Sequence, residues 1–154
     1  RQDYLKYKFG SVEAAKPMYD NMVKEAKKEN IKFNLEKIEI TPNTNFSHIL
    51  TKLAFSKNEG HEVLSKIFDA YFFRGKDIGD RDILVEIGKS SNINEKEIYD
   101  VFSSEKKINE INKSDVVARS MGINGVPFFE INNKTYISGA QSKTNLIEAI
   151  KANL

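Results

Sequence analysis

The stretch GINGVPFFEINNKTYISGAQ, residues 122–141, decides the fold of this chain. It predicts a Gly-Val-Pro turn, a strand VPFFEI, a tight turn at Asn132 and Asn133, and a second strand KTYIS. Asparagine tolerates the left-handed backbone angles that a tight hairpin turn requires. Ser142 is then placed to cap a last helix that carries Leu146, Ile147 and Ile150. An isolated hairpin is only marginally stable in water, so this one must pair with a further strand or pack on helices.

The composition is that of a globular domain of ordinary size. The chain has 154 residues, of which 40% are apolar and 30% charged. The net charge is +2 with interleaved signs, so nothing indicates nucleic acid or a membrane surface as a partner. No apolar run approaches the roughly 18 residues of a membrane helix. The absence of cysteine excludes disulfides, thiolate metal sites and any thiol nucleophile on this chain, and it fits a cytoplasmic, reducing compartment.

Upstream of the hairpin the apolar residues recur at helical spacing. Pro17 interrupts the first of these patterns, so the first helix either contains it or begins later, near it. Residues 31–40 alternate instead, which indicates a short strand or an extended linker. Asp80 and Asn94 are predicted to cap the helices that follow them. The expected helices cover residues 11–30, 44–58, 63–75, 80–91, a segment from 94, and 104–121.

The order of elements is many helices, then a hairpin, then a helix. Two strands make a poor sheet for so many helices, so the chain resembles part of an α/β layered structure whose first strands are missing. We expect two regions. Residues 1–121 form a helical domain with a connecting helix, and residues 122–154 form a C-terminal ββα part.

The segment ARSMGINGVPFFEINNKTYISGAQ resembles the C-terminal part of DsbA-like thioredoxin-fold proteins. It is most similar to the FrnE-type dithiol–disulfide isomerases, which group with 2-hydroxychromene-2-carboxylate isomerases and kappa-class glutathione transferases. The segments TPNTNFSHILTKLAF and LSKIFDAYFFRGKDIGDRDILVEIG agree with this resemblance. It covers nearly the whole chain, from about Tyr4 to Leu154.

The resemblance implies an α/β, DsbA-like thioredoxin fold with an inserted all-helical domain. This chain would lack the opening βαβ segment that carries the Cys-x-x-Cys motif, so no catalytic residue lies in it. The family implies a thiol–disulfide oxidoreductase or isomerase without a cofactor, inactive as this chain alone. The alternatives are a non-catalytic peptide- or ligand-binding thioredoxin-like protein, or a glutathione-dependent isomerase or transferase relative.

The resemblance also implies the site. Pro127 would be a cis-proline facing the Cys-x-x-Cys pair, and the backbone of Val126 would face an extended substrate. The simpler interpretation is that Pro127 only begins a strand, where proline is tolerated. His48 would approach the substrate side, or it is an ordinary half-exposed helical residue. The two isolated histidines, His48 and His61, predict no metal site.

The expected partner is a protein or small-molecule dithiol or disulfide substrate. Because the strand that normally pairs with VPFFEI is absent, its edge is expected to invite a homodimer or a swapped oligomer. Tyr71, Phe72 and Phe73 form an aromatic cluster. It is interpreted as core of the helical domain, with the wall of an apolar substrate groove as the alternative.

Overall fold

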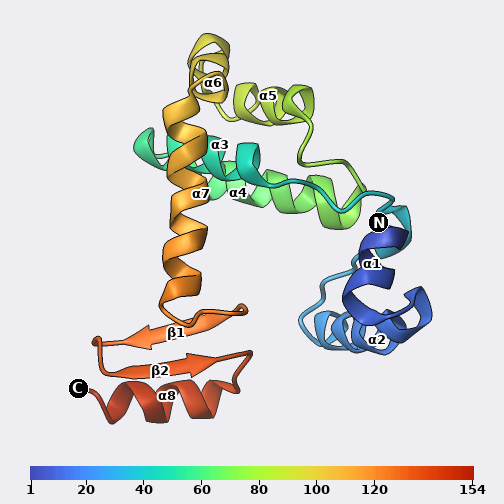
Figure 1. Cartoon of the computed structure of the whole chain (residues 1–154), viewed down its shortest axis with the longest axis vertical. Helices are drawn as coiled ribbons and strands as arrows, with labels where there is room; N and C mark the ends of the chain where they lie inside the picture. The colour runs from blue at the N-terminus through green and yellow to red at the C-terminus, as the bar shows by residue number, and fades with distance from the viewer. The chain divides into compact units, whose positions relative to one another are not determined.

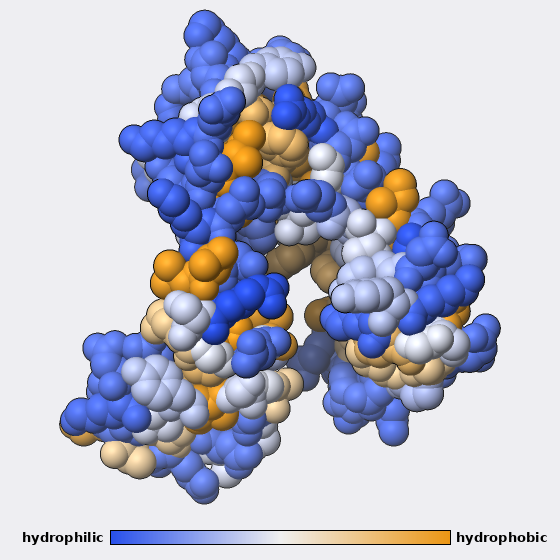
Figure 2. All heavy atoms as spheres, in the orientation of Figure 1, coloured by the Kyte–Doolittle hydropathy of each residue, from blue (hydrophilic) through white to orange (hydrophobic).

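The computed structural model describes residues 1–154, which form two compact units, residues 1–111 and 112–154 (Figure 1). The division falls inside helix α7 (Glu105–Ser120), whereas the sequence places it after residue 121. Each unit is described by itself. Polar side chains cover most of the visible surface and leave scattered apolar patches between them (Figure 2).

The first unit is all-helical up to the first half of α7. The second unit contains the rest of α7, the hairpin of β1 (Phe128–Ile131) and β2 (Thr135–Ser138), and helix α8 (Lys143–Lys151). The other elements of the first unit are α1 (Gln2–Phe9), α2 (Val12–Lys28), the 3₁₀ turn η1 (Leu35–Lys37), α3 (Asn45–Ser56), α4 (Gly60–Phe68), the π-helical turn η2 (Asp69–Phe73), α5 (Arg81–Lys89) and α6 (Glu95–Phe102).

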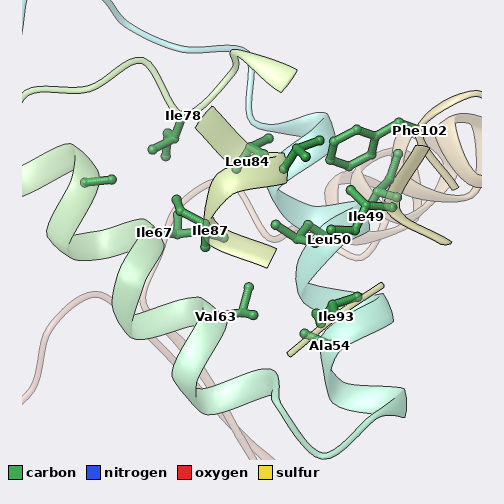
Figure 3. Close-up of a cluster of buried hydrophobic side chains, with 13 residues drawn as sticks. Ile49, Leu50, Ala54, Val63, Ile67, Ile78, Leu84, Ile87, Ile93 and Phe102 are labelled. Carbon is green, nitrogen blue, oxygen red and sulfur yellow. The ribbon is translucent and has the colours of Figure 1, made fainter. Parts of the chain in front are cut away.

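The core of the first unit lies among α3, α4, α5 and α6, whose apolar residues point toward one another (Figure 3). Leu50, Leu84 and Ile98 are fully buried, and Phe102 is 1% exposed. Gly88 lets α5 approach α6 closely, since a Cβ there would lie 2.4 Å from the Ile98 Cδ1 atom. The helical spacing of the apolar residues in α3, α4, α5 and α6 is therefore explained by this one core.

The predicted caps of α5 and α6 are confirmed. The Asp80 carboxylate accepts hydrogen bonds from the backbone N–H groups of Asp82 and Ile83. The Asn94 side chain accepts from the N–H groups of Lys96 and Glu97. These acceptors satisfy amides that the first turn of a helix leaves without a partner.

The N-terminal part departs from the prediction in several places. Helix α1 is not indicated by the apolar pattern. Helix α2 begins directly after its cap Ser11, whose hydroxyl accepts from the Ala14 N–H at 3.0 Å, so the later start near Pro17 is wrong and Pro17 lies within the helix. Residues 31–40 form no strand. They are the linker alternative, and the Asn34 N–H donates to the Phe72 carbonyl at 2.8 Å.

The aromatic residues that follow α4 occupy the π-helical turn η2. Tyr71 packs against the core, and burial raises the pKa of its phenol. The Phe72 ring lies 5.1 Å from the Phe33 ring of the linker, and Phe73 is 38% exposed. The cluster is therefore partly core and partly the contact that holds the linker.

The hairpin in the second unit is confirmed. β1 and β2 are antiparallel, and Phe129 is paired with Ile137. Asn132 and Asn133 have φ values of 50° and 53°, the left-handed angles expected of the turn. No residue of the second unit is buried, so this unit has no core of its own.

Candidate functional site: the Gly-Val-Pro turn and the open edge of β1

The turn begins where α7 ends. Gly122 has a φ of 82°, which favours glycine, and its N–H donates to the Arg119 carbonyl at 2.9 Å. The Ile123 N–H reaches back to the Ala118 carbonyl at 3.1 Å. This pair of bonds closes the helix C-terminus and leads the chain into residues 124–127.

Val126 and Pro127 lie at the surface just before β1. The bond between them is cis, the isomer that the resemblance implies. The Val126 side chain is 88% exposed, and its backbone makes no hydrogen bond within the chain. Pro127 is anchored, since its carbonyl accepts from the Gly139 N–H at 2.8 Å. An exposed, unpaired residue thus precedes a residue fixed to the hairpin.

The bond to Gly139 also determines which backbone groups of β1 are free. It makes Pro127 and Gly139 a hydrogen-bonded position of the ladder. Because such positions alternate in antiparallel pairs, Phe129 and Ile131 bond to β2, and the N–H and C=O groups of Phe128 and Glu130 point away from it. β1 has no other strand partner, so this edge is open.

The side chains of each strand point alternately to the two faces of the hairpin. Phe129 and Ile131 share one face with their partners on β2, and all are partly buried. Phe128 and Tyr136 lie on the other face, with their rings 6.2 Å apart. Each face therefore offers apolar surface beside the open edge.

Side-chain hydrogen bonds fasten α8 to the hairpin. Ser142 caps α8, as predicted, by accepting from the Asn145 N–H. The Thr135 hydroxyl donates to the Asn153 side chain at 3.0 Å, and the Asn132 amide donates to the Asn153 carbonyl. Residue Asn153, which follows α8, is thus tied to the turn and to the start of β2.

The structure places the predicted site residues in different units. Val126 and Pro127 lie in the second unit, and His48 is an exposed residue of α3 in the first. His61, near the start of α4, packs against Phe55 with ring centroids 5.3 Å apart. Phe128 and Glu130 were not singled out as site residues, although strand alternation from the Gly-Val-Pro turn gives the signal that finds them.

The site carries no nucleophile of its own. The chain contains no cysteine, and no group of three His, Asp or Glu side chains is arranged to hold a metal ion. None of the helices combines the length and apolar character needed to cross a bilayer. What residues 122–141 offer chemically is an open strand edge, exposed apolar side chains and unpaired backbone groups.

The first unit has a groove of its own. It has a volume of about 480 Å³ and runs along α2 beside the linker. Its lining carries two acidic and two basic side chains. The residues lining it are Tyr19, Asp20, Val23, Lys24, Lys27, Phe33, Leu35 and Glu36.

Comparison with known proteins identifies the class. The model of the DSBA-like thioredoxin domain family matches residues 5–151, so the chain belongs to this family. A probable DsbA oxidoreductase from Streptomyces coelicolor has a similar crystal structure, with a TM-score of 0.79 and 23% sequence identity. The match covers 97% of this chain and 64% of that one. A search of curated proteins finds no significant match. The predicted DsbA-like thioredoxin fold is confirmed.

Proposed function

We propose that this chain is the helical and ββα part of a thiol–disulfide oxidoreductase of the DsbA type, closest to the FrnE group. A Cys-x-x-Cys segment outside these residues would carry the redox chemistry. The open edge of β1, beside the exposed Val126 and the anchored Pro127, carries the proposal. A strand of that segment would pair with Phe128 and Glu130, whose backbone groups have no other partner.

The physical argument for this proposal is that the backbone groups on the outer edge of β1 have no hydrogen-bond partner. Unpaired strand groups and half-buried Phe129 and Ile131 call for a neighbouring strand. A helix N-terminus placed there would stabilise a cysteine thiolate, with a pKa lowered to about 3.5–7.5. The Val126 backbone would then bind an extended dithiol or disulfide substrate as an added strand. A cytoplasmic location and the absence of a cofactor remain predictions.

The test is insulin reduction with dithiothreitol by the full natural protein that contains these residues. We expect turnover when that protein carries Cys-x-x-Cys and none when both cysteines are changed to serine. The 154-residue chain is expected to be inactive by itself. An intact Cys-x-x-Cys protein that is folded but gives no turnover would overturn the proposal.

A surface variant tests the role of Val126 in that same protein. Val126→Asp should raise KM for a peptide disulfide about tenfold, because a charge replaces an apolar contact of about 1.4 kcal/mol at the binding strand. Val116→Asp, at a valine of α7 that is 65% exposed, is the matched control and should leave KM unchanged. Equal effects of the two variants would remove Val126 from the substrate site.

The absence of cysteine favours a second candidate, a non-catalytic protein that keeps the peptide-binding edge. It predicts that the natural protein binds extended peptides without turnover. The third alternative, a glutathione-dependent isomerase or transferase, is distinguished from the other two because it would require glutathione in the same assays.

A further inference from the structure

The residues Gly-Ala-Gln at positions 139–141 connect β2 to α8 and have no part in the proposed function so far. We propose that Gln141 is a positioning residue for the substrate turn, which consists of Val126 and Pro127. Gln141 fixes Gly139, and Gly139 in turn holds Pro127. The inference rests on the proposed function, because it names the side chain that keeps the binding strand of that same site in place.

Gly139 holds Pro127 only if its own backbone is fixed. Its N–H donates to the Pro127 carbonyl at 2.8 Å, and its φ of 87° turns the chain away from β2. β2 itself ends one residue earlier, at Ser138. Glycine has more backbone freedom than any other residue, so neighbouring groups must restrain it. The hold on Pro127 therefore depends on what fixes residues 138–139.

The Gln141 side chain supplies this restraint. Its Nε2 atom donates to the Ser138 carbonyl at 3.4 Å and to the Gly139 carbonyl at 3.5 Å, as a donor shared between two acceptors. The Ser138 carbonyl and the Gly139 N–H belong to one peptide group. That group accepts from Gln141 at one end and donates to Pro127 at the other, and hydrogen bonds in such a chain strengthen one another.

Asn145, in the first turn of α8, fixes the orientation of the Gln141 amide. Its Nδ2 atom donates to the Gln141 Oε1 atom at 3.3 Å, and its backbone N–H donates to the Ser142 hydroxyl at 3.1 Å. Backbone carbonyls only accept, so the NH2 group of Gln141 faces them and its oxygen faces Asn145. A chain of hydrogen bonds thus runs from the first turn of α8 through Gln141 to Pro127.

A second link between the hairpin and the residues around α8 gives a matched control. Asn153 bonds to Asn132 in the turn and to Thr135 at the start of β2. These residues lie at the end of the hairpin opposite to Pro127. If Gln141 only fastened α8 to the hairpin, loss of either link would have the same effect on Pro127. A positioning residue acts from the Pro127 end alone.

Amide hydrogen exchange, followed by NMR in the full natural protein that contains these residues, tests the hold on Pro127. Gln141→Glu keeps the size of the side chain and the oxygen that faces Asn145, but it removes the NH2 donor. It should accelerate exchange of the Gly139 N–H about fivefold, the effect of losing a hydrogen bond of ordinary net strength. Gln141→Ala, which adds no charge, should give the same result.

Asn153→Ala is the control and should leave exchange of the Gly139 N–H unchanged. If neither Gln141 variant accelerates this exchange, or if Asn153→Ala accelerates it equally, the proposal is overturned. Absence of turnover in the unmodified protein would instead overturn the proposed function alone, because exchange at Gly139 requires no activity.

Kinetics with a peptide disulfide measure the consequence for the substrate turn. Both Gln141 variants should raise KM about fivefold and leave kcat unchanged, because they weaken binding equally in the ground state and the transition state. Asn153→Ala should change neither constant. An unchanged KM in Gln141 variants whose Gly139 N–H exchanges faster would show that this bond does not position the substrate turn, which also overturns the proposal.

Discussion

The two units bury apolar side chains to very different extents. Every buried hydrophobic residue lies in residues 1–111, and thirteen of them form one cluster. In residues 112–154 comparable side chains stay at the surface: Val116 is 65% exposed and Met121 61%. Burial of apolar area is the main favourable term in folding, so the first unit carries its own stability. The second unit would have to pack against a neighbouring surface to gain comparable stability from burial.

Helix α7 shows this difference within a single element. Its first half contributes Ile108 and Ile111 to the core of the first unit. Its second half carries Val116 and Val117, both more than half exposed. The helix is continuous, so local sequence preference does not explain the contrast. The contrast is explained by the neighbouring surface, because only the first half of α7 packs against a core within its own unit.

The largest expected effect is in the core. Phe102→Ala should cost about 3–5 kcal/mol, because a fully buried aromatic side chain in contact with Phe46 is replaced by a cavity. Its counterpart, Phe129→Ala, removes a half-buried ring and should cost less than about 2 kcal/mol. Urea unfolding followed by circular dichroism measures both. Equal losses of stability would show that Phe129 packs against as much apolar surface as Phe102 does, and that the second unit has a core after all.

A pair of glycines gives the next effect. Gly88→Ala should cost about 1–3 kcal/mol, because its Cβ would meet Ile98 at 2.4 Å and Leu50 at 3.2 Å. A Cβ at Gly125 would meet nothing within 4 Å, so Gly125→Ala should be neutral. The comparison of melting temperatures is sufficient here. A neutral Gly88→Ala would mean that α5 and α6 can separate without cost.

The sequence predicts those parts of the structure that depend on local chemistry. The caps Asp80, Asn94 and Ser142 and the Asn132–Asn133 turn are short-range hydrogen-bonding and backbone preferences, and all of them are confirmed. Helix α1 was not predicted because its apolar pattern is weak. The alternation of apolar and polar residues in 31–40 was ambiguous. It occurs in strands, and also in a linker that packs one of its sides on helices.

The candidate site was predictable only in part. The Gly-Val-Pro turn stands out in the sequence, but which groups of β1 are free depends on the bond between Pro127 and Gly139, a contact between strands. His48 was proposed on the resemblance alone, and it is an exposed residue of the other unit. Relations between units arise from long-range packing, which apolar periodicity does not encode.

The smallest expected effect compares two helix caps. Asp80→Ala and Ser142→Ala each remove an acceptor for amides in the first turn of a helix, worth about 1 kcal/mol. Asp80 caps α5, which packs in the core, so its loss should lower the urea midpoint of the whole first unit. Ser142 caps α8, which has no buried residue, so its loss should fray α8 locally and leave that midpoint unchanged. Amide hydrogen exchange distinguishes the two responses. If Ser142→Ala accelerated exchange of no amide in α8 but lowered the midpoint as much as Asp80→Ala, the two units would unfold together, and the independence of the helical unit would be wrong.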